Sequence, residues 1–247
     1  MNNTLPPKKC WFRLVSLAAL TFFSVSAISQ STPDITLNYT IKVSGAKLGT
    51  LAAKLSFNGT TYQSTSETRA EGLASILLGG DLFESCTFTF DGQKVISTSY
   101  SSFKQGRGAY QNDTNFDWEN RKISFGPEKT LILDIPNGYV VDNCNMAFAA
   151  TLSKGQMSTD EPFYIVDAKM HRIRGYLVLN ITNEMIGTEI GDLNTIKIEM
   201  QREAVPDRTL TLWLAEDEQY VLVRMVEKRS SRTTTMDIES IDGVFIH

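Results

Sequence analysis

The chain has 247 residues, of which 42% are hydrophobic and 21% charged, the balance of a folded globular protein and not of a disordered one. Its 24 basic and 28 acidic residues give a formal charge of −4 at pH 7. An acidic chain repels phosphate backbones, so composition argues against nucleic acid as a partner. With two histidines in the whole chain, a zinc centre built on several imidazoles is excluded.

The first segment is typical of a secretory signal peptide. A short basic region precedes the apolar run 14–23, and Val25-Ser26-Ala27 has the small-residue pattern that signal peptidase cleaves. We predict cleavage after Ala27, a periplasmic location, and a mature chain 28–247 that forms one β-rich domain. The apolar run is too short for a permanent membrane-spanning helix, and we expect no transmembrane segment in the mature protein.

The cysteines support this interpretation. Cys10 leaves with the predicted signal peptide, which leaves Cys86 and Cys144 as an even pair in an oxidising compartment. That context favours a disulfide over a metal site. The competing interpretation is a reactive thiol on Cys144 at the start of a helix, but no C-x-x-C motif accompanies it.

Most of the chain after residue 34 alternates between apolar and polar residues, as half-buried strands do. The alternation begins with Ile35, Leu37 and Tyr39. It recurs in segments 51–57, 60–68, 86–90, 94–103, 131–135, 173–181, 196–200, 210–214 and 221–225. Asn58-Gly59 and Asp91-Gly92 supply hairpin turns. The pattern predicts a mainly β fold, a single antiparallel domain in the form of a sandwich or barrel.

Two stretches break the alternation and predict short helices. The segment 72–78 has apolar residues at helical spacing and is stopped by Gly79-Gly80. The segment 143–154 follows a capping residue, Asp142, and precedes Gly155.

Motifs in the second half resemble those of a family of exported bacterial proteins. Glu184–Gly191 is similar to the family's "plus-T-x-x-G" turn, which leads into a "T-x-K-V" strand, here 195–198. Arg208–Asp217 is similar to its "R-x-x-x-x-W-L-A-x-D" strand, and Tyr220–Met225 follows where members usually have "P-V-R-I". The family is catalogued as domain of unknown function 3108. The resemblance is strongest from Ile165 onward.

This resemblance implies an antiparallel β protein, an open or incomplete barrel that holds an apolar ligand, with a β-sandwich as the alternative. It implies no particular activity. The chain departs from the family pattern at Leu222, where a proline is common, and at Cys144, near a position expected to be serine.

No catalytic constellation is evident in the sequence. His171 with Asp167 is the one available pair for nucleophilic catalysis, and no G-x-S-x-G elbow occurs. The acidic run 216–218 has the residue type of a glycosidase, and Asp113, Asp117 and Glu119 that of a calcium site, but both are more simply explained as solvated hairpin tips. We therefore predict no catalytic residue, metal or cofactor.

Trp213 has two interpretations. It lies on the strand face opposite Leu212, so it either closes the edge of a sandwich or lines an internal cavity. In the second case Trp213, Tyr220 and Leu222 form one wall, and Arg208 or Arg224 meets an anionic head group at the mouth. The competing role for both arginines is a solvated face.

These observations lead to an expected function. We expect a non-enzymatic periplasmic protein that binds an apolar or amphipathic ligand, such as a lipid, or an envelope component. The alternatives are a hydrolase of envelope polymers and a structural or assembly factor that pairs with an envelope protein through a sheet edge.

Overall fold

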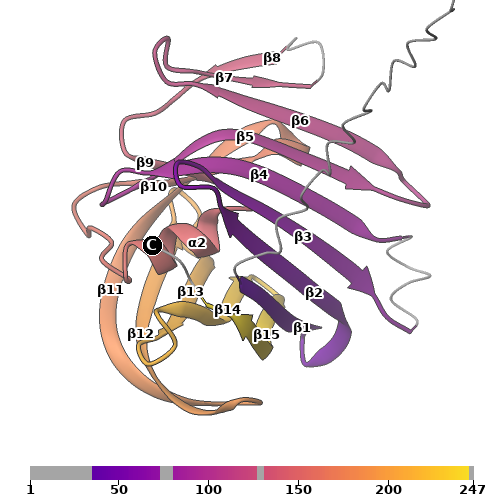
Figure 1. The fold of residues 1–247 in the computed structure, drawn as a ribbon, viewed down its shortest axis with the longest axis vertical. Helices are drawn as coiled ribbons and strands as arrows, with labels where there is room; N and C mark the ends of the chain where they lie inside the picture. The colour runs from indigo at the N-terminus through magenta and orange to yellow at the C-terminus, as the bar shows by residue number, and fades with distance from the viewer. Residues whose placement is uncertain (1–34, 73–79, 127–130, 245–247) are drawn as a thin grey trace, which may run out of the picture. The chain divides into compact units, whose positions relative to one another are not determined.

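Fifteen strands form one continuous sheet in the computed structural model, which describes residues 35–72, 80–126 and 131–244 (Figure 1). The first eight strands are β1 (Ile35–Val43), β2 (Ala46–Phe57), β3 (Tyr62–Ala70), β4 (Leu82–Phe90), β5 (Val95–Lys104), β6 (Tyr110–Asp117), β7 (Lys122–Phe125) and β8 (Leu131–Asp134). The remaining seven are β9 (Tyr139–Asp142), β10 (Phe163–Asp167), β11 (Arg172–Thr188), β12 (Gly191–Arg202), β13 (Arg208–Ala215), β14 (Val221–Arg229) and β15 (Arg232–Gly243).

The order of strands across the sheet follows the chain closely. It runs β8-β7-β6-β5-β4-β3-β2-β1-β15-β14-β13-β12-β11-β10-β9, so the first and last strands of the chain meet in the middle. Every pair is antiparallel except β9 and β10. Consecutive hairpins of alternating residues explain this order, because each strand can pair with its successor through a short turn.

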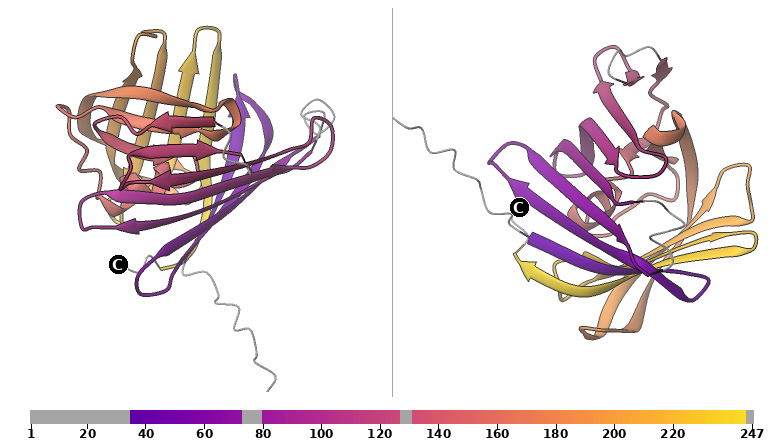
Figure 2. Two further views of the ribbon diagram at one scale, coloured as in Figure 1. Left: turned by 90° about the horizontal axis from the view of Figure 1, so that it is seen from above. Right: turned by 90° about the vertical axis from the view of Figure 1, so that its right-hand side faces the viewer.

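The sheet rolls up on itself without closing. Strands β9 and β10 are paired at one end of the sheet, β6 to β8 at the other, and the two ends overlap face to face (Figures 1 and 2). A small apolar cluster fills the overlap: Phe116, Ile123, Phe125, Ile135, Val140 and Val166. The opposite face of β10 contributes Phe163 and Ile165 to the main core. The fold is therefore an open barrel, as predicted, and not a sandwich of two sheets.

One α-helix, α2 (Met146–Leu152), lies within the curve of the sheet, against β5, β9 and β14 (Figure 1). Phe148 at its centre is 2% exposed. The predicted helix over 143–154 is thus confirmed, but it begins later than predicted because the Asp142 carboxylate holds the N–H groups of Cys144 and Asn145 in a preceding turn. Gly155 follows the helix with φ +72°, as expected of a C-terminal glycine.

The second predicted helix, over 72–78, falls almost wholly outside the described residues. Within them, the only other helical segment is a single 3₁₀ turn, η1 (Ala168–Met170). None of the helices in the described ranges is long and apolar enough to cross a membrane.

Candidate functional site

A trough follows the concave face of the sheet. Its inner hollow, about 120 Å³, lies between α2 and strands β1 to β4, β14 and β15. Ten apolar side chains line it: Leu37, Tyr39, Leu51, Ala53, Met146, Ala147, Phe148, Leu222, Met225 and Met236. Among the described residues that line this hollow, Glu84 is the single charged one.

An outer hollow of about 250 Å³ lies on the same strands, closer to the open end of the curve. On these strands, the residues that line the two hollows lie two positions apart. On β1 Tyr39 lines the inner hollow and Ile41 the outer one, and on β4 Glu84 lines the inner hollow and Leu82 the outer one. Two residues of a strand span roughly 7 Å. We call these two neighbouring hollows together the trough.

The lining changes from apolar to cationic along the trough. The outer hollow has an apolar floor that includes Ile41, Val43 and Leu82, but Lys104, Lys169 and Arg232 stand around it. The Lys169 ammonium lies 5.1 Å from the ring centre of Tyr110, which also lines this hollow. An apolar channel that ends among cations has the polarity needed for an amphipathic anion.

Glu84 is the polar group at the inner end. The Tyr100 hydroxyl donates to Glu84 Oε1 at 2.5 Å, and Ser66 Oγ donates to Oε2 at 3.4 Å. Burial raises the pKa of the Glu84 carboxyl, and these two hydrogen bonds only partly oppose that effect. The alternation of β4 contains a signal for this residue, because Glu84 lies between Leu82 and Cys86 on the apolar face, but Glu84 is not among the predicted site residues.

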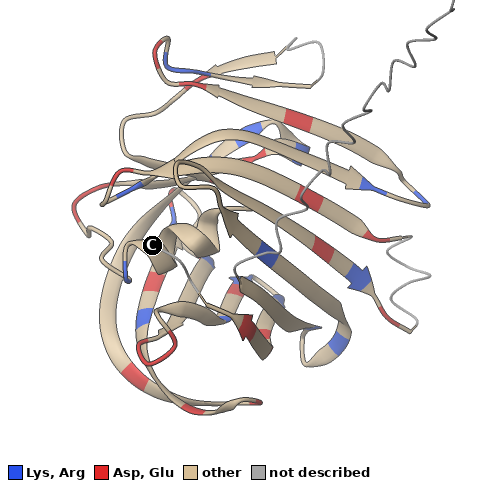
Figure 3. Cartoon of the chain, viewed as in Figure 1, with Lys and Arg blue, Asp and Glu red and all other residues tan. Residues whose placement is uncertain are grey.

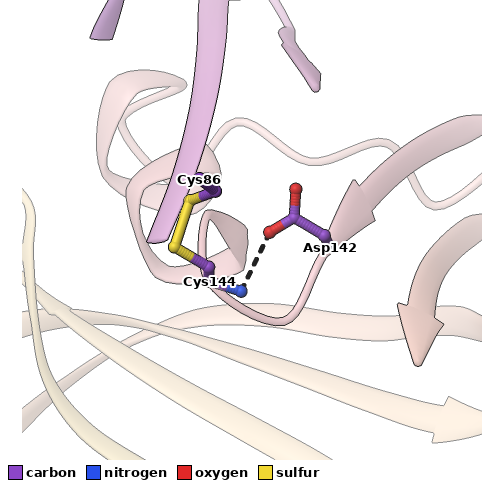
Figure 4. A group of neighbouring side chains, drawn as sticks. All are labelled: Cys86, Asp142 and Cys144. Atoms are coloured by element: carbon purple, nitrogen blue, oxygen red, sulfur yellow. Dashed lines mark hydrogen bonds between the residues drawn. A yellow bond between two sulfur atoms is a disulfide. The ribbon is translucent and has the colours of Figure 1, made fainter. Parts of the chain in front are cut away.

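The inner end of the trough is held by a disulfide and a buried polar network. Cys86 on β4 and Cys144 before α2 form the predicted disulfide, with their Cα atoms 6.1 Å apart (Figure 4). Asp142, 1% exposed, accepts hydrogen bonds from the backbone N–H groups of Cys144 at 2.9 Å and Asn145 at 3.0 Å. Asn145 Nδ2 in turn donates to Asp142 Oδ2 and to Ser97 Oγ.

Burial raises the pKa of the Asp142 carboxyl to about 7, even though its hydrogen bonds act in the opposite direction. Cys86, Asp142 and Cys144 have the residue types of a metal site, and their potential ligand atoms lie within 4.8 Å of one another. The disulfide leaves no free thiolate in this group, so its three side chains form a structural cross-link and a turn.

The sequence between residues 38 and 239 matches a family described as "Protein of unknown function (DUF3108)". The chain belongs to this family. The predicted resemblance is therefore confirmed over most of the chain. No curated protein matches the sequence.

Two solved structures are similar to this DUF3108 chain. A "beta-barrel-like protein of domain of unknown function DUF1849" from Brucella abortus is 8% identical, with a TM-score of 0.51 over 85% of this chain and 97% of the other. This likeness supports the fold alone. A DUF1329 family protein from Desulfovibrio piger is 11% identical over 86% of each chain, with a TM-score of 0.21, which is too low to compare the folds.

The structure separates the residues predicted to form one pocket wall. Trp213 faces the convex side, where it pairs across strands with Lys197 and Arg224. Its indole N–H donates to Glu184 Oε2 at 3.1 Å. The Lys197 ammonium lies 5.7 Å from the ring centre. Trp213 therefore lies outside the trough, in a half-buried patch of charged neighbours.

Leu222 lies on the opposite face from Trp213. The turn between β13 and β14 holds the five residues 216–220, so Leu222 pairs with Leu214 and faces the core, 1% exposed. It lines the inner hollow. The expectation that Trp213 and Leu222 share a wall is therefore wrong, because alternation alone does not fix the length of the turn that sets the register.

The other three predicted pocket residues are also divided. Arg224 lies on the convex side, where it pairs with Asp237 at 2.5 Å and donates to the carbonyl of Gly187. Tyr220 has φ +60° in the turn between β13 and β14, outside the trough lining. Arg208 alone of the three lies at the open end of the concave face, directly across from Arg229.

The candidate catalytic pair is not assembled. The Asp167 carboxylate, 2% exposed, is bound to Arg174 and Arg172 and does not orient His171. Burial acts to raise the pKa of Asp167, but the hydrogen bond and charge of Arg174 outweigh it and hold that pKa below its usual value. His171 is exposed and lies over the Phe125 ring, with 5.3 Å between ring centres.

Proposed function

We propose that this DUF3108 protein is an exported, non-enzymatic binding protein that holds the apolar part of an amphipathic ligand in the trough. The observation that carries the proposal is the graded lining of the concave face, from Met146 and Phe148 of α2 at the inner end to Lys104, Lys169 and Arg232 at the outer end. Burying an apolar chain against such a lining releases roughly 25 cal/mol for each Å² removed from water.

The first test is whether the protein carries a bound ligand when it is isolated from its host. Native mass spectrometry of protein released from the host periplasm without detergent is expected to show an adduct that organic solvent extracts. The same measurement reports the start of the chain, and we expect it at Ile28, after cleavage at Ala27.

Ala53→Trp is the variant that tests the site. Ala53 lines the inner hollow, so an indole at this position fills the space and is expected to abolish the adduct. Its matched control is Ala52→Trp, one residue away on the opposite face of β2, where Ala52 lines a convex-side depression. Overpacking costs about 1–3 kcal/mol, so circular dichroism and thermal melting must show that both variants fold. Equal adducts on the two folded variants would place the ligand elsewhere.

A second candidate function rests on the edge strand β8. Its residues Leu131 and Ile132 are 39% and 55% exposed, and β7 is its single neighbour in the described part of the sheet. An exposed strand edge with apolar side chains can pair with a strand of another protein. Cross-linking from a photoreactive residue at position 132 in intact cells tests this candidate, and a specific envelope protein product would favour it.

A further inference from the structure

Arginine side chains gather at the open end of the concave face. Six of them come from five neighbouring strands: Arg172 and Arg174 of β11, Arg202 of β12, Arg208 of β13, Arg229 of β14 and Arg232 of β15. We call them the arginine row; Figure 3 shows the Lys and Arg positions in blue.

The alternation of the strands places these side chains on the concave face. Arg202 follows the buried Met200 by two residues, and Arg208 precedes the buried Leu210 by two. Arg202 also pairs across strands with Tyr176, a core residue. Cross-strand partners and residues two apart share a face, so the row continues the core face beyond its apolar part.

The members of the row repel one another. Arg208 lies directly opposite Arg229, and Arg229 lies directly opposite Arg232. Like charges at such positions destabilise a sheet. The pKa of Arg202 is lowered, first by partial burial and then by the charges of its neighbours in the row, although Tyr176 opposes this.

Two carboxylates bind three of the six arginines in the row. Asp167 binds Arg172 and Arg174, and Glu227 binds Arg229 with two contacts of 2.7 Å. Arg202, Arg208 and Arg232 form no ion pair with any residue of the described ranges. Three guanidinium groups at one end of an acidic protein are thus left without a counter-charge from the described chain.

The row adjoins the trough, because Arg232 belongs to both. We infer that the arginine row binds the phosphate group of a phosphorylated amphiphile whose apolar part lies in the trough, an inference that rests on the proposed function. A phosphate monoester carries a charge of about −1.5 to −2 and three acceptor oxygens. It matches three unpaired guanidinium groups better than a carboxylate, which has one charge and two oxygens.

The experiment compares head groups on identical chains. Calorimetry at one salt concentration measures binding of monomeric dihexanoyl phosphatidic acid, dihexanoyl phosphatidylcholine and inorganic phosphate. We expect phosphatidic acid to bind about tenfold or more tightly than either of the others. Arg202→Gln and Arg208→Gln are each expected to weaken phosphatidic acid about tenfold, as loss of a hydrogen bond to a charged group does, and to leave phosphatidylcholine unchanged.

Lys228→Gln is the matched control. Lys228 is exposed on β14, one residue from Arg229 and on the other face, so this variant makes the same change of charge outside the row. It is expected to bind phosphatidic acid as the wild type does. Melting of the ligand-free proteins separates binding from folding, because removing Arg208 relieves repulsion and is expected to leave the Tm unchanged or raise it.

The possible outcomes separate this inference from the proposed function. Equal affinity for the two lipids, unchanged in Arg202→Gln and Arg208→Gln, overturns the phosphate site but leaves the trough. Inorganic phosphate that binds as tightly as phosphatidic acid identifies a free phosphate ligand and overturns the link to the trough. Absence of binding by both lipids overturns the proposed function as well.

Discussion

The two ends of the concave face differ in how their polar and charged groups are paired. At the inner end α2 fills the curve of the sheet, a disulfide ties β4 to the segment before α2, and Asp142 has hydrogen-bond partners on both oxygens. At the open end, arginines face one another across neighbouring strands, and three of them have no counter-charge from the described chain. The inner end is arranged for stability, whereas the open end keeps a destabilising repulsion that a bound anion would relieve.

We expect the largest loss of stability when a large core side chain is removed at the inner end. Phe148 on α2 contacts the ring of Phe88 on β4, with 6.4 Å between ring centres, and is almost completely buried. Phe148→Ala removes the ring and leaves a cavity, so urea unfolding should show a loss of about 3–5 kcal/mol. A loss under 1 kcal/mol would mean that α2 contributes little to the core and that the two ends differ less than the structure indicates.

We expect the next largest loss of stability when the disulfide is removed. Cys86 and Cys144 are 58 residues apart, and a cross-link over such a distance typically contributes about 2–4 kcal/mol. The double variant Cys86→Ala, Cys144→Ala should therefore unfold at a lower urea concentration, and its free energy of unfolding should be lower by that amount. Protein isolated from its host and denatured without reductant should have no free thiol at Cys86 or Cys144. Two free thiols in that sample would show that the bond does not form in the cell.

Asp142 should make the stability depend on pH. Its pKa is about 7 in the folded protein, above the value of about 3.9 for an unperturbed carboxyl, so the folded state binds the proton more tightly. The resulting stabilisation is complete below about pH 4 and is lost as the pH rises through 7. Glu84 acts in the same direction. Unfolding measured from pH 5 to pH 8 should show falling stability.

Asp142→Asn provides the matching variant. Its amide replaces an oxygen that accepts from Asn145 Nδ2, so at pH 5 we expect a loss of about 1–3 kcal/mol. Its stability should also fall less steeply between pH 5 and pH 8 than that of the wild type. The same slope in both proteins would assign the pH dependence to another group.

The smallest effect is expected at Trp213. Its side chain lies on the convex face, so Trp213→Phe removes one partly exposed hydrogen bond, to Glu184, at a cost of about 1 kcal/mol or less. Ligand binding should be unchanged, in contrast to Ala53→Trp. If Trp213→Phe released the ligand, the convex face would be the binding surface. Neither end of the concave face would then be the ligand site.

Local features of the sequence predict much of the fold. Alternation identifies the strands, because side chains of a strand point to opposite faces in turn, and the hairpin turns between them predict antiparallel pairing. An even pair of cysteines predicts the bond between Cys86 and Cys144, and the break in alternation around Phe148 predicts α2. The family motif of Arg208–Asp217 predicts the open barrel. Each of these depends on residues close together in the chain or on a count.

The site depends on tertiary structure. Alternation shows that a strand has two faces but does not show which is concave, and the register set by the turn between β13 and β14 places Trp213 and Leu222 on opposite faces. The trough forms only where the sheet curves around α2. The arginine row brings together strand ends between Arg172 and Arg232, and their contact is set by the pairing and register of five strands. The sequence by itself therefore determines the strands, the helix and the disulfide, whereas the curvature and register of the sheet decide where a ligand can bind.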